Sequence, residues 1–267
     1  MAAPHGKRAL CAFLHSPLLT GSSWGGTPEL FRAAGFDALV VEVSGDDREP
    51  FARRYVAAAA AQLEQAHHGR PVVLIGHSGA GPLLPAVRAA VCPGVTVPAI
   101  IYCDANLPRP GANRLDLTGL DPAQREQLLL LLATGWRYPS WTDEYLAGVE
   151  RVTDPAQRAL LLDTVNPRDE AYLLEPLPYA PVHPTITQGY LQLSARYGPE
   201  ADRAQTLGWP LTRLDHTHFH ALVDPEGTAA ALTTLTRRCL APAAVVDGPP
   251  APLGRCSGPS GAADRTI

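Results

Sequence analysis

The sequence predicts an α/β fold with a mostly parallel sheet of about six strands and helices on both faces. Short apolar runs alternate along the chain with longer helix-compatible segments, as in parallel strands joined by crossover helices. The apolar runs are unbroken, which is typical of strands buried on both faces. With 267 residues, 46% of them hydrophobic and 18% charged, the chain is long enough for one large domain with a sizeable core.

The first half of the chain shows this alternation clearly. Strands are predicted over residues 9–14 and 37–43. Between them lies a helix over about residues 27–34, which Gly35 ends because glycine readily takes the left-handed conformation that closes a helix. An alanine-rich helix over residues 50–65 then leads to the third strand.

The second half returns to the same pattern after an interruption. A fourth strand covers residues 97–103, and a fifth covers residues 185–193. A helix over residues 199–207 precedes the last strand, residues 210–214. The final helix spans residues 225–240 and is opened by a proline at its first position.

The third strand, which begins at Val72, runs directly into Gly76-His77-Ser78-Gly79-Ala80-Gly81. A helix-compatible segment over residues 83–91 follows, in which Pro85 is expected to cause strain. Such a strand–turn–helix unit needs small residues on both sides of the serine and lifts its hydroxyl above the sheet. The alternative is a glycine-rich turn with an incidental serine.

This unit resembles the nucleophile elbow of the α/β-hydrolases, with Ala80 in place of the last glycine of G-x-S-x-G. The resemblance covers about residues 8–240 and implies a nucleophilic Ser78 with the triad order serine, acid, histidine. The Gly79 N–H would then be one oxyanion donor. In the family the loop after the first strand supplies the second donor. Here that loop reads His15-Ser16-Pro17-Leu18, and because proline has no N–H we expect Leu18 to donate.

Three histidines, His216, His218 and His220, follow the last strand. The chain resembles the branch of plant esterases and hydroxynitrile lyases, in which the catalytic histidine stands about seven residues before the proline that opens the last helix. His218 has this distance from Pro225, so we expect it to be the base. His216 and His220 are the alternatives, and His220 either faces the pocket or is a core histidine.

The acid is expected at Asp104, which ends the fourth strand. Most α/β-hydrolases carry it after the strand that follows the lid, but the segment there, residues 191–197, has no carboxylate. Haloalkane dehalogenases resemble this chain in carrying their acid on the earlier strand, although their chemistry requires an aspartate where Ser78 stands. Glu200 and Asp202 are the alternatives, and both are expected on the solvent face of a helix.

Residues 112–183 interrupt the alternation and resemble the helical lid of α/β-hydrolases. Two Asp-Pro-Ala-Gln-Arg segments, at 121–125 and 154–158, each predict a helix that starts with an aspartate cap and a proline. The helices are expected over residues 128–133 and 159–165. The lid aromatics Trp136, Tyr138 and Trp141 either line the pocket or pack the lid on the core. His15 is a further pocket candidate, or else a structural residue.

The predicted organisation is one α/β-hydrolase domain, residues 1–240, with a lid insertion over residues 112–183. Residues 241–267 are rich in Pro, Gly, Ala and Ser and are expected to be a disordered tail. Five widely spaced cysteines form neither a disulfide pattern nor a metal-ligand pattern. No signal sequence or membrane span is recognisable, so a cytoplasmic location is expected.

The resemblance implies a serine hydrolase that cleaves an ester or thioester of a small molecule through an acyl-enzyme, with no metal and no cofactor. A lyase using the same triad is the alternative. In the hydroxynitrile lyases a lysine of the lid assists the departure of cyanide, whereas the sole lysine here is Lys7. A binding protein on a hydrolase scaffold is a third possibility. The net charge of −4 argues against nucleic-acid and anionic-membrane partners, and the oligomeric state is left open.

Overall fold

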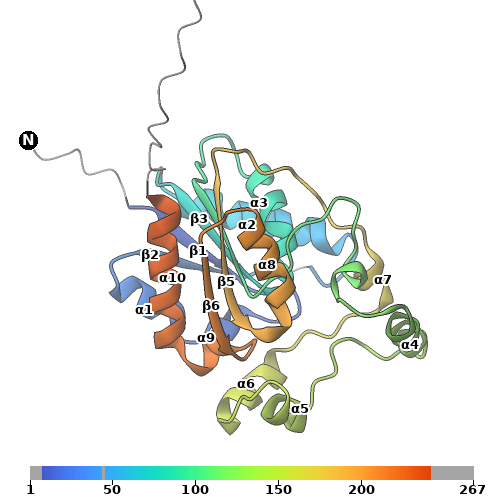
Figure 1. The fold of residues 1–267 in the computed structure, drawn as a ribbon. Helices are drawn as coiled ribbons and strands as arrows, with labels where there is room; N and C mark the ends of the chain where they lie inside the picture. The colour runs from blue at the N-terminus through green and yellow to red at the C-terminus, as the bar shows by residue number, and fades with distance from the viewer. Residues whose placement is uncertain (1–7, 44–45, 242–267) are drawn as a thin grey trace, which may run out of the picture.

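The computed structural model describes residues 8–43 and 46–241. A six-stranded sheet lies at its centre, parallel throughout, in the order β2-β1-β3-β4-β5-β6 (Figure 1). The strands are β1 (Leu10–Leu14), β2 (Asp37–Val41), β3 (Val72–His77), β4 (Ala99–Cys103), β5 (Thr187–Ser194) and β6 (Leu211–His216). The predicted fold class is confirmed, and each predicted strand is present with its ends shifted by at most two residues.

Helices cover both faces of the sheet (Figure 1). Phe13 of β1 points to one face, where it packs with Phe31 and Leu232. Its neighbour Leu14 points to the other face, into the cluster that contains Tyr55. The helices on the first face are α1 (Thr27–Ala33) and α10 (Pro225–Leu240), and those on the second are α2 (Phe51–Ala66), α3 (Leu84–Ala90) and α8 (Gly198–Thr206). Because both sides are covered, β1, β3 and β4 are buried along their whole length, as their unbroken apolar sequences predict.

After the turn at Ser78 the structure has two consecutive helices, whereas the sequence predicts a single one. Ser78–Leu83 forms a 3-10 helix, and α3 begins only at Leu84. Pro85 therefore falls in the first turn of α3, where its missing N–H leaves no intrahelical bond unmade. The expected strain is absent because the helix restarts.

Residues 112–183 contain four α-helices, all outside the sheet on the right and lower side of Figure 1. They are α4 (Pro122–Ala133), α5 (Asp143–Gly148), α6 (Pro155–Thr164) and α7 (Glu170–Leu174). The predicted caps are confirmed, since Asp121 Oδ1 accepts from the Gln124 N–H at 2.9 Å and Asp154 Oδ1 from the Ala156 N–H at 2.8 Å. The predicted helices began too late, because each helix starts at the proline after its cap.

This helical segment, called the lid below, is tied to the loop after β1. The Asn166 N–H donates to the Leu18 carbonyl at 2.8 Å. The buried guanidinium of Arg168 donates to the Pro17 carbonyl and forms an ion pair with Asp46, both at 3.1 Å. These contacts hold the lid over the edge of the sheet at which the parallel strands end.

Two predictions concern parts of the chain at the limits of the described residues. Of the predicted tail, residues 241–267, all but Ala241 lie outside them. Within residues 8–43 and 46–241, none of the helices has both the length and the apolar character that crossing a membrane requires.

Candidate active site

Ser78 occupies the tight turn between β3 and the 3-10 helix with a φ of +56°, which is a strained conformation for a non-glycine residue. Small neighbours are needed for packing reasons. A Cβ on Gly76 would come within 2.8 Å of the Leu84 side chain, and one on Gly81 within 2.6 Å of Ala105 Cβ. Ala80 is fully buried. The close packing explains why the sequence here is restricted to glycine and alanine.

The structure brings Ser78, His218 and Asp104 together in one hydrogen-bonded chain. The Oγ of Ser78 lies 3.0 Å from His218 Nε2, and His218 Nδ1 lies 2.7 Å from Asp104 Oδ2. The three residues follow β3, β6 and β4, so they meet where parallel strands end. An incidental serine in a glycine-rich turn would not require a histidine and a carboxylate aligned behind it.

Asp104 is completely buried and accepts four hydrogen bonds. Its Oδ1 accepts from the backbone N–H groups of Leu193 and Ser194, at 2.8 and 2.9 Å, and its Oδ2 accepts from the Ser194 hydroxyl at 2.7 Å and from His218. Asp104 itself has a φ of +44°. The Tyr190 hydroxyl holds the turn that follows by donating to the Ala105 carbonyl at 2.8 Å. The carboxylate is therefore fixed in position by its surroundings.

Ser194 is a residue of the site whose role was not predicted from the sequence. It ends β5, and most α/β-hydrolases carry their acid just after this strand. Here the serine hydroxyl at this strand end donates to the Asp104 carboxylate instead. Besides the missing carboxylate after β5, the hydroxyl at the end of this strand is a further sequence signal that the acid comes from the neighbouring strand.

Neither alternative acid contacts His218. Asp202 is exposed and pairs with Arg213 at 2.7 Å. The expected solvent position is wrong for Glu200, because its Oε2 is buried without a hydrogen-bond partner among the described residues and the side chain lines the cavity next to Ser78. Burial raises the pKa of Glu200 and outweighs the opposing effect of Arg203. Glu200 lies in the first turn of α8, at the end of the helix next to the cavity. Its position in the helix sequence therefore does not predict its exposure.

The His218 ring lies between two other rings. His77 stacks against it at 4.5 Å between ring centroids, and Tyr197 does so at 5.1 Å. The Nε2 of His77 is 3.0 Å from the His218 carbonyl, to which it donates. Burial, together with the neighbouring His218, lowers the pKa of His77 to about 3. His77 therefore stays neutral and positions His218 without adding a second positive charge beside it.

The other two histidines of the loop do not enter this chain of contacts. His216 and His220 stack on each other at 4.1 Å, and His220 Nε2 lies 3.5 Å from Asp224 Oδ2. The interpretation of His220 as a pocket residue is wrong, because its buried side chain contacts His216 and Asp224 and does not line the cavity next to Ser78. In the part of the chain that the structure describes, no three His, Cys, Asp or Glu side chains gather as metal ligands.

The proposed oxyanion donors both lie beside Ser78. Gly79 is the second residue of the 3-10 helix, so its N–H precedes the first bond within that helix. A Cβ on Gly79 would be 3.1 Å from Ser16 Oγ, which shows how closely the loop after β1 approaches. The Leu18 N–H donates to the same Ser16 Oγ at a long 3.3 Å. A developing oxyanion would compete with this weak bond.

His15 is not a pocket residue, contrary to one of the two interpretations of it. Its Nδ1 donates to the Ser16 carbonyl at 2.8 Å, and its Nε2 accepts from the Val43 N–H at 3.3 Å. The Tyr55 hydroxyl donates to the His15 carbonyl at 2.6 Å. With both ring nitrogens engaged by backbone groups, His15 shapes the loop that carries Leu18.

A cavity with two lobes opens at Ser78 between the sheet and the lid. The first lobe, of about 210 Å³, extends from Ser78 and Gly79 to Arg114 and Glu200. The second lobe, of about 300 Å³, extends from Ser78 and His218 to the lid aromatics. All three candidate aromatics, Trp136, Tyr138 and Trp141, line the second lobe, and Tyr138 also lines the first. Trp141 packs on Phe219 at 5.3 Å as well, so both interpretations of the lid rings hold.

Comparison with solved structures gives the same architecture. An extracellular α/β-hydrolase from a Paenibacillus species, described as sharing structural and functional homology with tobacco salicylic acid binding protein 2, has a TM-score of 0.69 at 16% identity, over 85% of this chain and 98% of that one. A methylesterase from Arabidopsis has a TM-score of 0.58 at 18% identity, over 86% and 99%. Polyneuridine aldehyde esterase has a TM-score of 0.63 at 15% identity, over 86% and 100%.

At these identities the structural likeness establishes the fold alone. No curated protein sequence matches the chain. The family model described as "Alpha/beta hydrolase family", however, matches residues 10–231, a range that includes every strand of the sheet and the whole of the Ser78, His218 and Asp104 arrangement. The chain therefore belongs to the α/β-hydrolase family.

Proposed function

We propose that the protein is a serine hydrolase that cleaves a carboxylic ester, or a thioester, of a small organic molecule through an acyl-enzyme. The observation that carries the proposal is the continuous chain of hydrogen bonds from Asp104 through His218 to Ser78. A serine hydroxyl needs such a base, and the base needs an orienting carboxylate, to act as a nucleophile. Two of the structures with the same fold are named as esterases, which supports this choice.

In the proposed mechanism each residue has its own step. Ser78 Oγ attacks the carbonyl carbon while its proton passes to His218 Nε2, and Asp104 stabilises the imidazolium that forms. The N–H groups of Gly79 and Leu18 would hold the oxyanion. His218 then returns the proton to the leaving alcohol or thiol as its bond to the carbonyl carbon breaks. Water, deprotonated by the same nitrogen, attacks the acyl-enzyme and releases the acid and Ser78.

A lyase that uses the same three residues is the competing function. The lid, residues 112–183, has no lysine, which weakens the resemblance to the hydroxynitrile lyases. Hydrolysis in water enriched in oxygen-18 separates the two chemistries. A hydrolase places the heavy oxygen in the acid product, whereas an elimination leaves the product unlabelled.

A fluorophosphonate probe tests the nucleophile directly, because it reacts with activated serines. The wild-type protein should be labelled at Ser78, and Ser78→Ala should lose both label and turnover while its circular dichroism is unchanged. The matched control is Ser22→Ala, in the 3-10 helix Gly21–Trp24, which should be labelled like the wild type. Labelling of another serine in Ser78→Ala would contradict the proposal.

A further inference from the structure

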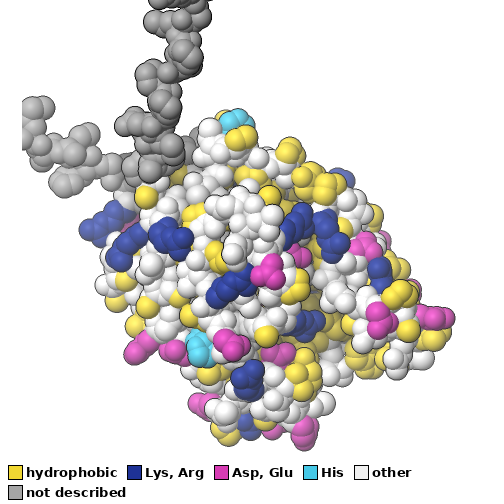
Figure 2. Space-filling model, viewed as in Figure 1, with side chains coloured by type: hydrophobic (Ala, Val, Ile, Leu, Met, Phe, Trp, Pro, Cys, Tyr) yellow, Lys and Arg dark blue, Asp and Glu magenta, His cyan; other side chains and the backbone are white. Residues whose placement is uncertain are grey.

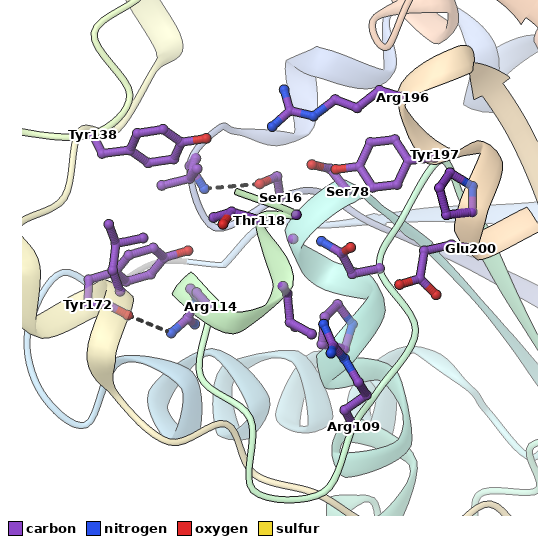
Figure 3. A pocket seen from close by; sticks show the side chains of 18 residues that line it. Ser16, Ser78, Arg109, Arg114, Thr118, Tyr138, Tyr172, Arg196, Tyr197 and Glu200 are labelled. Atoms are coloured by element: carbon purple, nitrogen blue, oxygen red, sulfur yellow. Dashed lines mark hydrogen bonds between the residues drawn. The ribbon is translucent and has the colours of Figure 1, made fainter. Parts of the chain in front are cut away.

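Three arginines line the two-lobed cavity, and the proposed chemistry uses none of them. Arg109, Arg114 and Arg196 all line the first lobe, and the facing carboxyl group is that of Glu200. Figure 3 shows the arginines around the hollow that contains Ser78. On this face of the molecule, basic side chains also lie along the depression between α8 and the lid (Figure 2). A cavity that handled only neutral esters would not need this concentration of positive charge.

Arg196 is the arginine that lines both lobes of the cavity. It lies in the 3-10 helix Ala195–Tyr197 directly after β5. In Figure 3 its guanidinium extends over Ser78 toward Tyr138. Its side chain has no hydrogen bond or ion pair with any other described residue, whereas Arg168 and Arg213 are each paired with an aspartate.

The surroundings keep Arg196 available to a ligand. Glu150 lines the second lobe together with Arg196 and accepts a hydrogen bond from the Tyr145 hydroxyl at 2.9 Å, with none from Arg196. Tyr197, the next residue, is fixed by its stacking on His218. The backbone of Arg196 is therefore held in place while its planar guanidinium, which suits two parallel bonds to a carboxylate, stays unpaired.

Arg114 holds a second positive charge at the wall of the first lobe. Its side chain is 11% exposed and its guanidinium lies 3.8 Å from the centre of the Tyr172 ring. The Nη1 donates to the Tyr172 carbonyl at 3.1 Å, but Nε and Nη2 are buried without a partner in the described chain. Glu175 lies 3.5 Å from Nη1 and offsets the charge in part. Three arginines face the single carboxyl group of Glu200 in the first lobe, and burial raises the pKa of that carboxyl group, so positive charge predominates there.

The direction of proton transfer decides which part of the ester enters which lobe. The leaving group takes its proton from His218, and His218 lines the second lobe. In the proposed mechanism the alcohol part would therefore lie among the aromatic rings of that lobe. The acyl part would then lie in the first lobe, beside Gly79 and the arginines. The first lobe, about 210 Å³, is smaller than the roughly 300–1,000 Å³ of typical ligand pockets, so the acyl group is short.

We infer that the preferred substrate is an ester whose short acyl group carries a carboxylate, held in the first lobe beneath Arg196. This inference rests on the proposed hydrolysis and names its substrate class. The positive wall at Arg114 favours the same anion through space, and the carboxylate gives the unpaired guanidinium of Arg196 a partner when the substrate is bound.

Two esters that differ in one group test the inference. Mono-para-nitrophenyl glutarate and para-nitrophenyl valerate have acyl chains of equal length, one ending in a carboxylate and the other in a methyl group. The measured quantity is the ratio of their kcat/KM values at low ionic strength. The wild type should favour the glutarate. Arg196→Met should lower the ratio about ten- to one-hundred-fold, the value of a hydrogen bond to a charged group, and Arg196→Lys should lower it less.

The matched control is Arg88→Met, an exposed arginine of α3 outside both lobes, which should leave the ratio unchanged. The inference is overturned if the wild type prefers the valerate or if Arg196→Met keeps the wild-type ratio. A preference for an ester whose carboxylate is on the alcohol, such as para-carboxyphenyl butyrate, would overturn the placement in the first lobe. If neither ester is cleaved and Ser78 is not labelled by the fluorophosphonate, the hydrolase proposal itself has failed.

Discussion

Replacement of Asp104 by asparagine is the sharpest test of the proposed triad. The carboxylate accepts from the Leu193 N–H, the Ser194 N–H, the Ser194 hydroxyl and His218 Nδ1. The asparagine oxygen can keep the two backbone bonds, which involve Oδ1 alone. Its NH₂ group then takes the place of Oδ2. The Ser194 hydroxyl can rotate to accept from it, but His218 Nδ1 must also become an acceptor.

This change reverses the tautomer of His218. With Nδ1 unprotonated, the proton sits on Nε2 and points at Ser78, so the serine has no base. The same substitution in a serine protease triad costs about 10⁴-fold in kcat, which corresponds to about 5.5 kcal/mol at 1.36 kcal/mol per tenfold. We expect a loss of this size in Asp104→Asn, measured as kcat on a para-nitrophenyl ester. The near-isosteric side chain and the kept backbone bonds should preserve the fold, as thermal unfolding can show.

The control is Asp202→Asn, a carboxylate on α8 that is exposed and paired with Arg213, and it should leave kcat near the wild-type value. The reasoning is refuted if Asp104→Asn retains a large part of the activity, or if Glu200→Gln loses activity while Asp104→Asn does not. The second result would move the acid to α8.

Two further predictions concern the histidines. His218→Ala should lower kcat by about 10⁴- to 10⁶-fold, as loss of the base does in other triads, whereas His216→Ala and His220→Ala should cost far less; equal losses in all three would show that the base is misassigned. Burial lowers the pKa of His77 from 6.5 to about 3. The unfolded chain therefore binds a proton at this histidine at a higher pH than the folded protein does. The contribution of neutral His77 to stability is complete above pH 6.5 and is lost as the pH falls toward 3. In urea unfolding, the wild type should therefore lose stability relative to His77→Gln by up to about 1.4 kcal/mol per pH unit in that range, and a difference that does not change with pH would contradict the argument.

The sheet and its helices could be predicted because their signals are local. Strands buried on both faces must be apolar throughout, as β1, β3 and β4 are, and caps such as Asp121 and Asp154 act on the N–H groups two or three residues away. The elbow was recognisable for the same reason, since the need for small residues around Ser78 is met within one turn.

The surroundings of the site depend on contacts between distant segments, and there the sequence was a poorer guide. The exposure of Glu200 depends on how the lid and the segment after β4 close over α8, which no periodicity within α8 reports. Arg196 lies in a short segment after β5 with no periodic pattern, so its sequence position does not indicate that it lines the cavity. His15 and His220 are close to the site in sequence, but their partners fix where their rings point. His15 is held by the Val43 N–H, 28 residues away, and His220 by Asp224, one helical turn away.

The position of the acid shows how the sheet allows the carboxylate to follow either of two neighbouring strands, β4 or β5. Strands β4 and β5 are neighbours, with Cys103 opposite Leu191, so Asp104 after β4 and Ser194 at the end of β5 come close together. The 2.7 Å contact between Asp104 Oδ2 and Ser194 Oγ shows this adjacency directly. A carboxylate from either strand could orient His218, provided that the other strand supplies a small donor. The sequence carries both halves of this arrangement, an aspartate after β4 and a serine at the end of β5, and the hydrogen bond between them links the two halves in the fold.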